Sequence, residues 1–104
     1  MTLTYTVLYS REANFDFDYY TKKHMALAEK VFGHVLVDWK VVRYVDDEQT
    51  PFRVMATLVF TSREEHEAVM ASKIGATLLD DIKNYSNMAP VMMQQTDSAC
   101  KTEM

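Results

Sequence analysis

The chain has 104 residues, of which 48% are hydrophobic and 25% charged, and it contains only two glycines and two prolines. This length and composition indicate one globular domain and exclude intrinsic disorder, collagen-like repeats and low-complexity sequence. The net charge of −4 comes from 15 acidic and 11 scattered basic residues, so there is no basic stripe to bind nucleic acid.

The first half of the chain predicts a strand, a helix and a second strand. Residues 3–9 alternate and are rich in β-forming side chains, which indicates a strand. Between residues 16 and 32 the apolar positions recur at steps of three and four, which predicts a helix that ends at Gly33. Residues 35–45 predict a long second strand, and an acidic turn over 46–51 follows. The apolar face of the helix is expected to contain Phe17, Tyr20, His24, Leu27, Ala28 and Val31.

The second half predicts a strand, two helical pieces and a last strand. Residues 52–60 form the third strand, and the Ser-x-x-Glu of 62–65 is a capping box that starts a helix to about Ser72. A second helical piece is expected over 73–82, with the interruption at Gly75.

The last predicted strand covers residues 88–95, and Pro90 indicates that it lies at a sheet edge or at strand entry. Residues 96–104 are polar and lack periodicity, so we expect a domain over 1–95 and a flexible C-terminal tail.

This order of elements predicts an α+β fold of the ferredoxin-like βαββαβ type, with a four-stranded antiparallel sheet and helices on one face. The uncovered face should then be polar, yet it is expected to carry a patch too apolar for a monomer. We therefore predict a homodimer that packs through this sheet face. The alternative is that these side chains lie at wet strand ends. They are Leu8, Leu36, Val42, Met55, Val59 and Met92.

The single cysteine, Cys100, excludes an intrachain disulfide and a cysteine-based zinc site. The three histidines lie on separate elements without metal-ligand spacing, so we expect no metal and no cofactor. A secretory signal and a membrane-spanning run of roughly 20 apolar residues are both lacking, which predicts a cytoplasmic protein without a membrane partner.

His24 is the main candidate for chemistry, because a titratable group on an apolar helix face is suited to proton transfer. Tyr20 lies one turn away and can shuttle a proton or hold a ligand oxygen, whereas Tyr19 is expected to face elsewhere. The alternative is plain core packing for both His24 and Tyr20. His66 is expected at the border of the apolar face of the second helix.

Aromatic side chains of the strands and of the last loop are candidates to line a pocket for a flat organic ligand. Filling of the core is the alternative for each. These candidate ligand-binding residues are Tyr5, Trp39, Phe60 and Tyr85.

Two motifs resemble those of the EthD family. Residues 15–20, Phe-Asp-Phe-Asp-Tyr-Tyr, are followed three residues later by His-Met-Ala-Leu at 24–27, similar to the family's Phe-Asp-x-x-Tyr-Tyr-x-x-x-His-x-Pro-Leu. Residues 81–85, Asp-Ile-Lys-Asn-Tyr, and the Ala-Pro-Val of 89–91 resemble the family's Asp-Ile-Pro-Asn-Tyr and Pro-Val. The resemblance implies a dimeric α+β barrel, in which two ferredoxin-like protomers pack sheet to sheet and each holds a cleft between sheet and helices.

The superfamily of this resemblance includes muconolactone isomerases, aromatic polyketide cyclases and cofactor-independent quinol monooxygenases. It implies that His24 is the acid/base or ligand-polarising residue and that Tyr20 assists it. The chain departs from the family's pattern at three places: Ala26 and Lys83 replace prolines, and the acidic turn over 46–51 replaces a Gly-rich connection.

The expected function is therefore that of an EthD-like small-molecule-binding protein. The candidate reactions are cofactor-free isomerisation, cyclisation or oxygenation of a small aromatic or lactone-like metabolite. The alternative is a non-catalytic accessory or binding protein of an oxidative degradation pathway. A heme-degrading oxygenase has less support, because only one helix histidine points to it.

Overall fold

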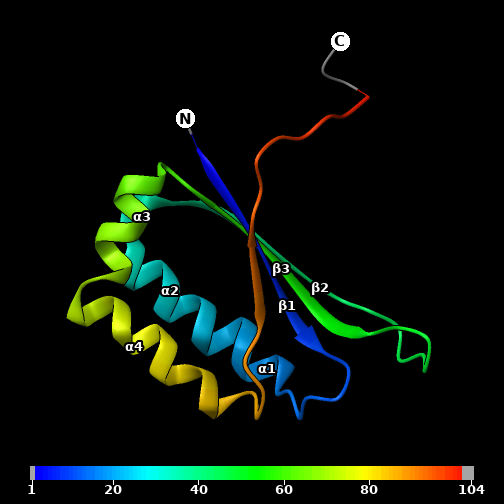
Figure 1. Cartoon of the computed structure of the whole chain (residues 1–104). Coiled ribbons are helices and arrows are strands. Elements are labelled where there is room, and N and C mark those ends of the chain that lie inside the picture. The colour runs from blue at the N-terminus through cyan, green and yellow to red at the C-terminus, as the bar shows by residue number, and fades with distance from the viewer. Residues whose placement is uncertain (1, 102–104) are drawn as a thin grey trace.

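The computed structural model describes residues 2–101 and consists of one sheet with helices packed on one of its faces (Figure 1). The strands are β1 (Leu3–Ser10), β2 (Leu36–Arg43), β3 (Phe52–Phe60) and β4 (Val91–Gln94). All neighbouring strands are antiparallel, in the order β2-β3-β1-β4. The predicted α+β ferredoxin-like fold is confirmed.

The helical segments connect β1 to β2 and β3 to β4. Asp16 begins the first connection, because its carboxylate accepts a hydrogen bond from the backbone N–H of Tyr19. Gly33 ends it with a positive φ of 56°, a conformation that favours glycine. The segments are α1 (Phe17–Tyr19), a π-helical turn (Tyr20–His24), α2 (Met25–Phe32), a 3-10 turn (Gly33–Val35), α3 (Arg63–Met70), α4 (Lys73–Asp81) and a second 3-10 turn (Ile82–Asn84).

The π-helical turn changes which face of the first helical segment is buried. The backbone N–H of Met25 bonds to the carbonyl of Tyr20, so this turn contains one residue more than an α-helical turn. As a result Met25 and Phe32 are almost completely buried, whereas Leu27 is only half-buried. The predicted period of three and four residues correctly placed Ala28 in the core and Leu27 and Val31 against it, but it missed Met25 and Phe32.

Two strands are shorter than predicted. β2 ends at Arg43 rather than at Val45, which is largely exposed, and β4 occupies only Val91–Gln94 of the predicted 88–95. β4 pairs with β1 alone, so the edge position that Pro90 indicated is confirmed. Residues 95–101 contain no helix or strand.

The face of the sheet opposite the helices carries several apolar side chains among polar ones, but two of its predicted apolar members lie on the other face. A bulge between Leu36 and Asp38 reverses the side-chain alternation, and it turns Leu36 toward the helices. Met92 pairs with the buried Val7 and so shares its side of the sheet. The apolar residues on the uncovered face, as the strand register places them, are Leu8, Val42, Met55, Val59, Val91 and Met93.

The sequence predicted that the helix is interrupted at Gly75. In the structure the interruption between α3 and α4 lies at Ala71–Ser72 instead. The hydroxyl of Ser72 accepts a hydrogen bond from the backbone N–H of Gly75 at 3.1 Å, and this cap starts α4. Gly75 is needed because a Cβ atom there would lie 2.1 Å from the backbone oxygen of Val69. The glycine allows the two helices to approach each other closely.

We expect Gly75→Ala to lower the free energy of unfolding by about 1–3 kcal/mol, because backbone must move to admit the methyl group. This cost exceeds the gain in helix propensity, which is about 1 kcal/mol. Urea unfolding would measure it, with Thr77→Ala on the exposed side of α4 as a control that stays within about 0.5 kcal/mol of the unchanged protein. A Gly75→Ala variant as stable as the unchanged chain would contradict the close approach.

Candidate functional site

A cavity of about 490 Å³ lies between the sheet and the helices. Strands β1, β3 and β4 form one wall, and α2, α3, α4 and the π-helical turn form the other. Its lining is mostly apolar and aromatic with a few polar groups, as is usual for a site that binds a small organic molecule. Among the lining residues are Tyr5, Tyr20, His24, Phe60 and Tyr85 of the predicted site.

Trp39 lies outside this cavity, although the sequence placed it among the ligand-binding candidates. It is on β2, the outermost strand on that side, and its indole Nε1 donates a hydrogen bond to the carboxylate of Glu29 at 2.9 Å. Trp39 therefore joins β2 to α2 and covers the core there.

His24 is held by a carboxylate at the end of α4. The Nδ1 atom of His24 lies 2.9 Å from Oδ2 of Asp81, and both side chains are 12% exposed. The Nε2 atom of His24 lies 3.5 Å from the hydroxyl of Tyr85. Because the carboxylate accepts the proton on Nδ1, the neutral imidazole carries its lone pair on Nε2, on the side of the tyrosine.

Asp81 also accepts hydrogen bonds from two other side chains. The hydroxyl of Tyr19 donates to its Oδ1 atom at 2.7 Å, and the amide of Asn84 donates to the same atom at 2.9 Å. The prediction that Tyr19 faces elsewhere is therefore wrong. Positions 19 and 24 are five residues apart, and the π-helical turn brings residues at this separation to one side of the helix.

Burial and hydrogen bonding set the charge states of this pair. Burial lowers the pKa of His24 below its usual 6.5, and the hydrogen bond and charge of Asp81 offset this only in part. Burial alone would raise the pKa of Asp81, but the hydrogen bonds from Tyr19, Asn84 and His24 outweigh it and hold the pKa below its usual value. At pH 7 the pair is therefore a neutral imidazole beside a carboxylate.

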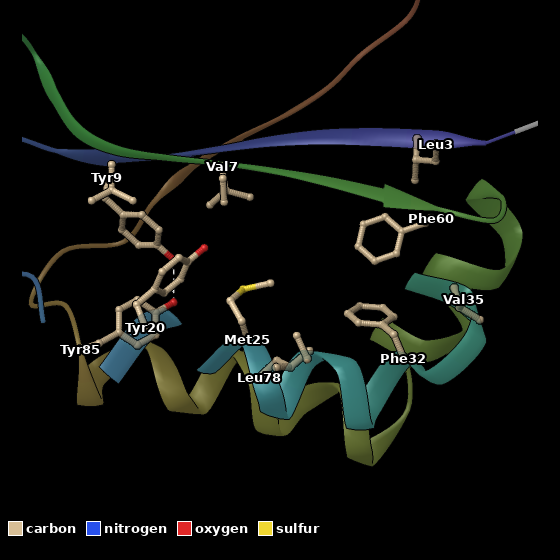
Figure 2. Packing of buried hydrophobic residues seen from close by; sticks show 13 residues of the cluster. Leu3, Val7, Tyr9, Tyr20, Met25, Phe32, Val35, Phe60, Leu78 and Tyr85 are labelled. Atoms are coloured by element: carbon tan, nitrogen blue, oxygen red, sulfur yellow. Dashed lines mark hydrogen bonds between the residues drawn. The ribbon is translucent and has the colours of Figure 1, made fainter. Parts of the chain in front are cut away.

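Figure 2 shows the rings of Tyr9, Tyr20 and Tyr85 gathered at one end of the core. Two of them, those of Tyr20 and Tyr85, contact the imidazole of His24. The hydroxyls of Tyr9 and Tyr85 lie 2.6 Å apart, and the ring of Tyr20 stacks on the imidazole with a centroid distance of 5.4 Å. Burial raises the pKa of all three hydroxyls well above the usual value of 10. They remain protonated at neutral pH and serve as hydrogen-bond donors, not as bases.

Sequence reasoning did not assign a role to Asp81, Tyr9 or Tyr19. Asp81 belongs to the second EthD-like motif, at 81–85, and the structure brings that motif against the first one at His24. Each of the two motifs contains a titratable residue, and this could have indicated that Asp81 is a partner of His24. Tyr9 ends the first strand in a Leu-Tyr pair that also resembles the family's pattern, but no role was inferred for it.

A second hollow, of about 690 Å³, lies between residues 14–18 and 83–87 with Arg43 at its side. It is broad and opens widely to solvent, and its side chains are mostly polar. The arginine is already stacked on the ring of Phe17, with 4.3 Å from Cζ to the centroid. The cavity between sheet and helices, which is the less open and more apolar of the two and contains His24, is therefore the candidate site.

Residues 2–101 contain neither a cluster of metal ligands nor a membrane-spanning helix. No group of three or more histidine, cysteine or acidic side chains there could hold a metal ion. Among the helices of the same residues, none is long and apolar enough to cross a membrane.

The comparisons with solved structures cover almost the whole chain. An EthD-like protein from Ralstonia eutropha JMP134 matches with a TM-score of 0.81 and 26% identity, over 99% of this chain and 97% of that one. SnoaB, a cofactor-independent oxygenase from Streptomyces nogalater, matches with a TM-score of 0.70 and 10% identity, over 98% of each chain. A dimeric ferredoxin-like protein of unknown function from Jannaschia sp. CCS1 matches with a TM-score of 0.64 and 10% identity, over 93% of this chain and 100% of that one.

No family model matches the chain, and no match was found among curated proteins. The two likenesses at 10% identity show the shared fold alone. The likeness to the Ralstonia protein has more residues in common and extends over both EthD-like motifs. The predicted resemblance to the EthD family is thereby confirmed, since the fold of the chain matches that of an EthD-like protein over 99% of its length.

Proposed function

We propose that this EthD-like chain binds a small aromatic or lactone-like metabolite in the cavity and that His24 acts on it as a general base and acid. The observation that carries the proposal is the His24–Asp81 pair in the cavity wall, in which Nδ1 is bonded to the carboxylate and Nε2, the acceptor nitrogen, has only a long contact of 3.5 Å with the hydroxyl of Tyr85. The likeness in fold to a cofactor-independent oxygenase supports this class of chemistry.

Each candidate reaction begins with removal of a proton from a phenol or from an activated C–H group. Neutral His24 accepts this proton on Nε2, and the carboxylate of Asp81 stabilises the imidazolium that forms. The hydroxyl of Tyr85, next to Nε2, can donate to the oxygen on which the ligand's negative charge develops. An isomerisation or cyclisation then returns the proton elsewhere on the ligand, whereas in an oxygenation the anion reacts with dioxygen.

The proposed assembly is a homodimer packed through the uncovered sheet face. An apolar patch on this face has its centre at Met55 of β3. Met55 is flanked by Leu8 of β1 and by Val42 of β2. Val91 and Met93 of β4 extend the patch and are each 48% exposed in the single chain. A second copy of the same face would cover this surface, and dimers occur among proteins of this fold.

His24→Ala is expected to lower turnover by about 10²–10⁴-fold or to abolish ligand binding, because the variant has no group to take up the proton. A panel of phenols, lactones and quinones, screened by thermal shift, would first identify a ligand that raises the melting temperature. His34→Ala, which removes an exposed histidine, is the matched control and should bind and react as the unchanged protein does. Ligand binding by the unchanged protein without any turnover would favour the non-catalytic accessory function.

Asp81→Asn is expected to lower the pKa of His24 further, because the carboxylate that partly offsets burial is lost. In the unchanged protein, His24 binds a proton less readily in the folded state than in the unfolded state, because its pKa is lowered. The free energy of unfolding should therefore fall as the pH decreases below about 6.5. NMR titration of His24 would measure both pKa values, with Asp80→Asn as the neighbouring control. An unchanged pKa in Asp81→Asn would contradict the pairing.

Met55→Glu is expected to convert the dimer into a monomer, because it places a charge at the centre of the apolar sheet face. Sedimentation velocity would give the mass of each species. Ile74→Glu introduces the same charge at a residue of α4 that is 60% exposed, and this control should remain a dimer. A Met55→Glu variant that still sediments as a dimer would show that the copies meet elsewhere.

A further inference from the structure

The end of the cavity away from His24 contains a second histidine. His66 lies on α3 and lines the cavity, and its ring packs among three aromatic rings. The centroid distances are 4.5 Å to Phe60, 4.8 Å to Tyr5 and 5.7 Å to Phe32. In the described part of the chain, its Nδ1 atom is buried and has no hydrogen-bond partner.

The two histidines lie at opposite ends of one cavity. Figure 2 shows Tyr20 and Tyr85 at one end, Phe32 and Phe60 at the other, and Met25 between them. The imidazole of His24 is in ring contact with the two tyrosines, and that of His66 with the two phenylalanines. The other lining residues are mostly apolar, and the charged Glu67 is next to His66 in the chain. A flat molecule that spans the cavity would therefore meet polar groups mainly near its two ends.

Packing does not explain an imidazole at position 66. A phenylalanine has nearly the same shape and would stack on the same rings, without an unpaired nitrogen in the wall. Rotation of the imidazole by 180° about the Cβ–Cγ bond exchanges the positions of Nδ1 and Cδ2 and changes the shape of the ring little. The aromatic contacts therefore do not fix Nδ1 in its buried position. Burial lowers the pKa of His66, which keeps the ring neutral with one donor and one acceptor nitrogen.

Tyr5 adds a hydroxyl to this end. Its oxygen accepts a hydrogen bond from the side-chain amide of Gln94 at 2.8 Å, so its own proton is left to donate. The imidazole and the phenol, whose ring centroids lie 4.8 Å apart, together offer two donors and one acceptor to a ligand oxygen. A ligand hydroxyl can bond to a donor and to the acceptor, and a ligand carbonyl can accept from the donors.

We propose that His66 and Tyr5 form a second polar subsite, which binds an oxygen at the far end of a flat ligand whose near end faces His24. This inference rests on the proposed function of the cavity and names its ligand class. The ligand is an aromatic or quinonoid molecule of two or more fused rings with an oxygen at each end. The cavity volume of about 490 Å³ lies in the range of pockets that hold drug-sized molecules, well beyond the need of one ring.

The test compares 2-naphthol with 2,6-dihydroxynaphthalene, which has the same rings and a second oxygen at the opposite end. The diol is expected to bind the unchanged protein about 3- to 10-fold more tightly by titration calorimetry, which is the range for one added hydrogen bond. In His66→Phe the two compounds should bind equally, at the affinity of 2-naphthol. The same variant should melt no lower than the unchanged protein, because it removes a buried nitrogen without a partner.

The ¹⁵N chemical shifts of the His66 imidazole give a second readout, which needs no variant. They should change with the diol and not with 2-naphthol. Equal binding of both compounds, with unchanged shifts, would overturn the second subsite and leave the proposed function of the cavity standing. No binding of either compound would overturn the proposed ligand class, because the cavity would then not accept fused aromatic rings. The proposed function itself would be overturned only if no phenol, lactone or quinone of the thermal-shift panel bound.

Discussion

The hydrogen bond between His24 and Asp81 is the interaction on which the candidate site depends. It joins the π-helical turn after α1 to the C-terminal end of α4, two segments that are 57 residues apart in the chain. It also decides the tautomer of the imidazole, since the carboxylate takes the proton on Nδ1. A site without this bond would have the same cavity but no defined base.

The surroundings of this pair keep a charge difference that burial alone would remove. A carboxylate with few water contacts tends to take up a proton, and Asp81 avoids this by accepting three side-chain hydrogen bonds. His24, which lies deeper among aromatic rings, stays neutral. Burial of His24 and the hydrogen bonds to Asp81 together thus favour a neutral imidazole beside an ionised carboxylate.

Local patterns in the sequence were sufficient for the order of the elements. Alternation marked β1, an apolar run marked β3, and the capping serine marked the start of α3. Errors arose where one residue changed a period: the π-helical turn moved Met25 and Phe32 into the core, and the bulge in β2 turned Leu36 to the helix side. A single inserted residue leaves no mark in composition, because its effect is only on the geometry that follows.

The sequence by itself determined the fold class, the apolar uncovered sheet face and the histidine on a half-buried helix side. These follow from periodicity and residue type, which are properties of neighbours in the chain. Only the tertiary structure decided that Asp81 and Tyr19 meet His24, that Trp39 lies outside the cavity, and that His66 lies at its far end. Such contacts join segments far apart in the chain, or depend on one extra residue in a turn, and no local pattern encodes either.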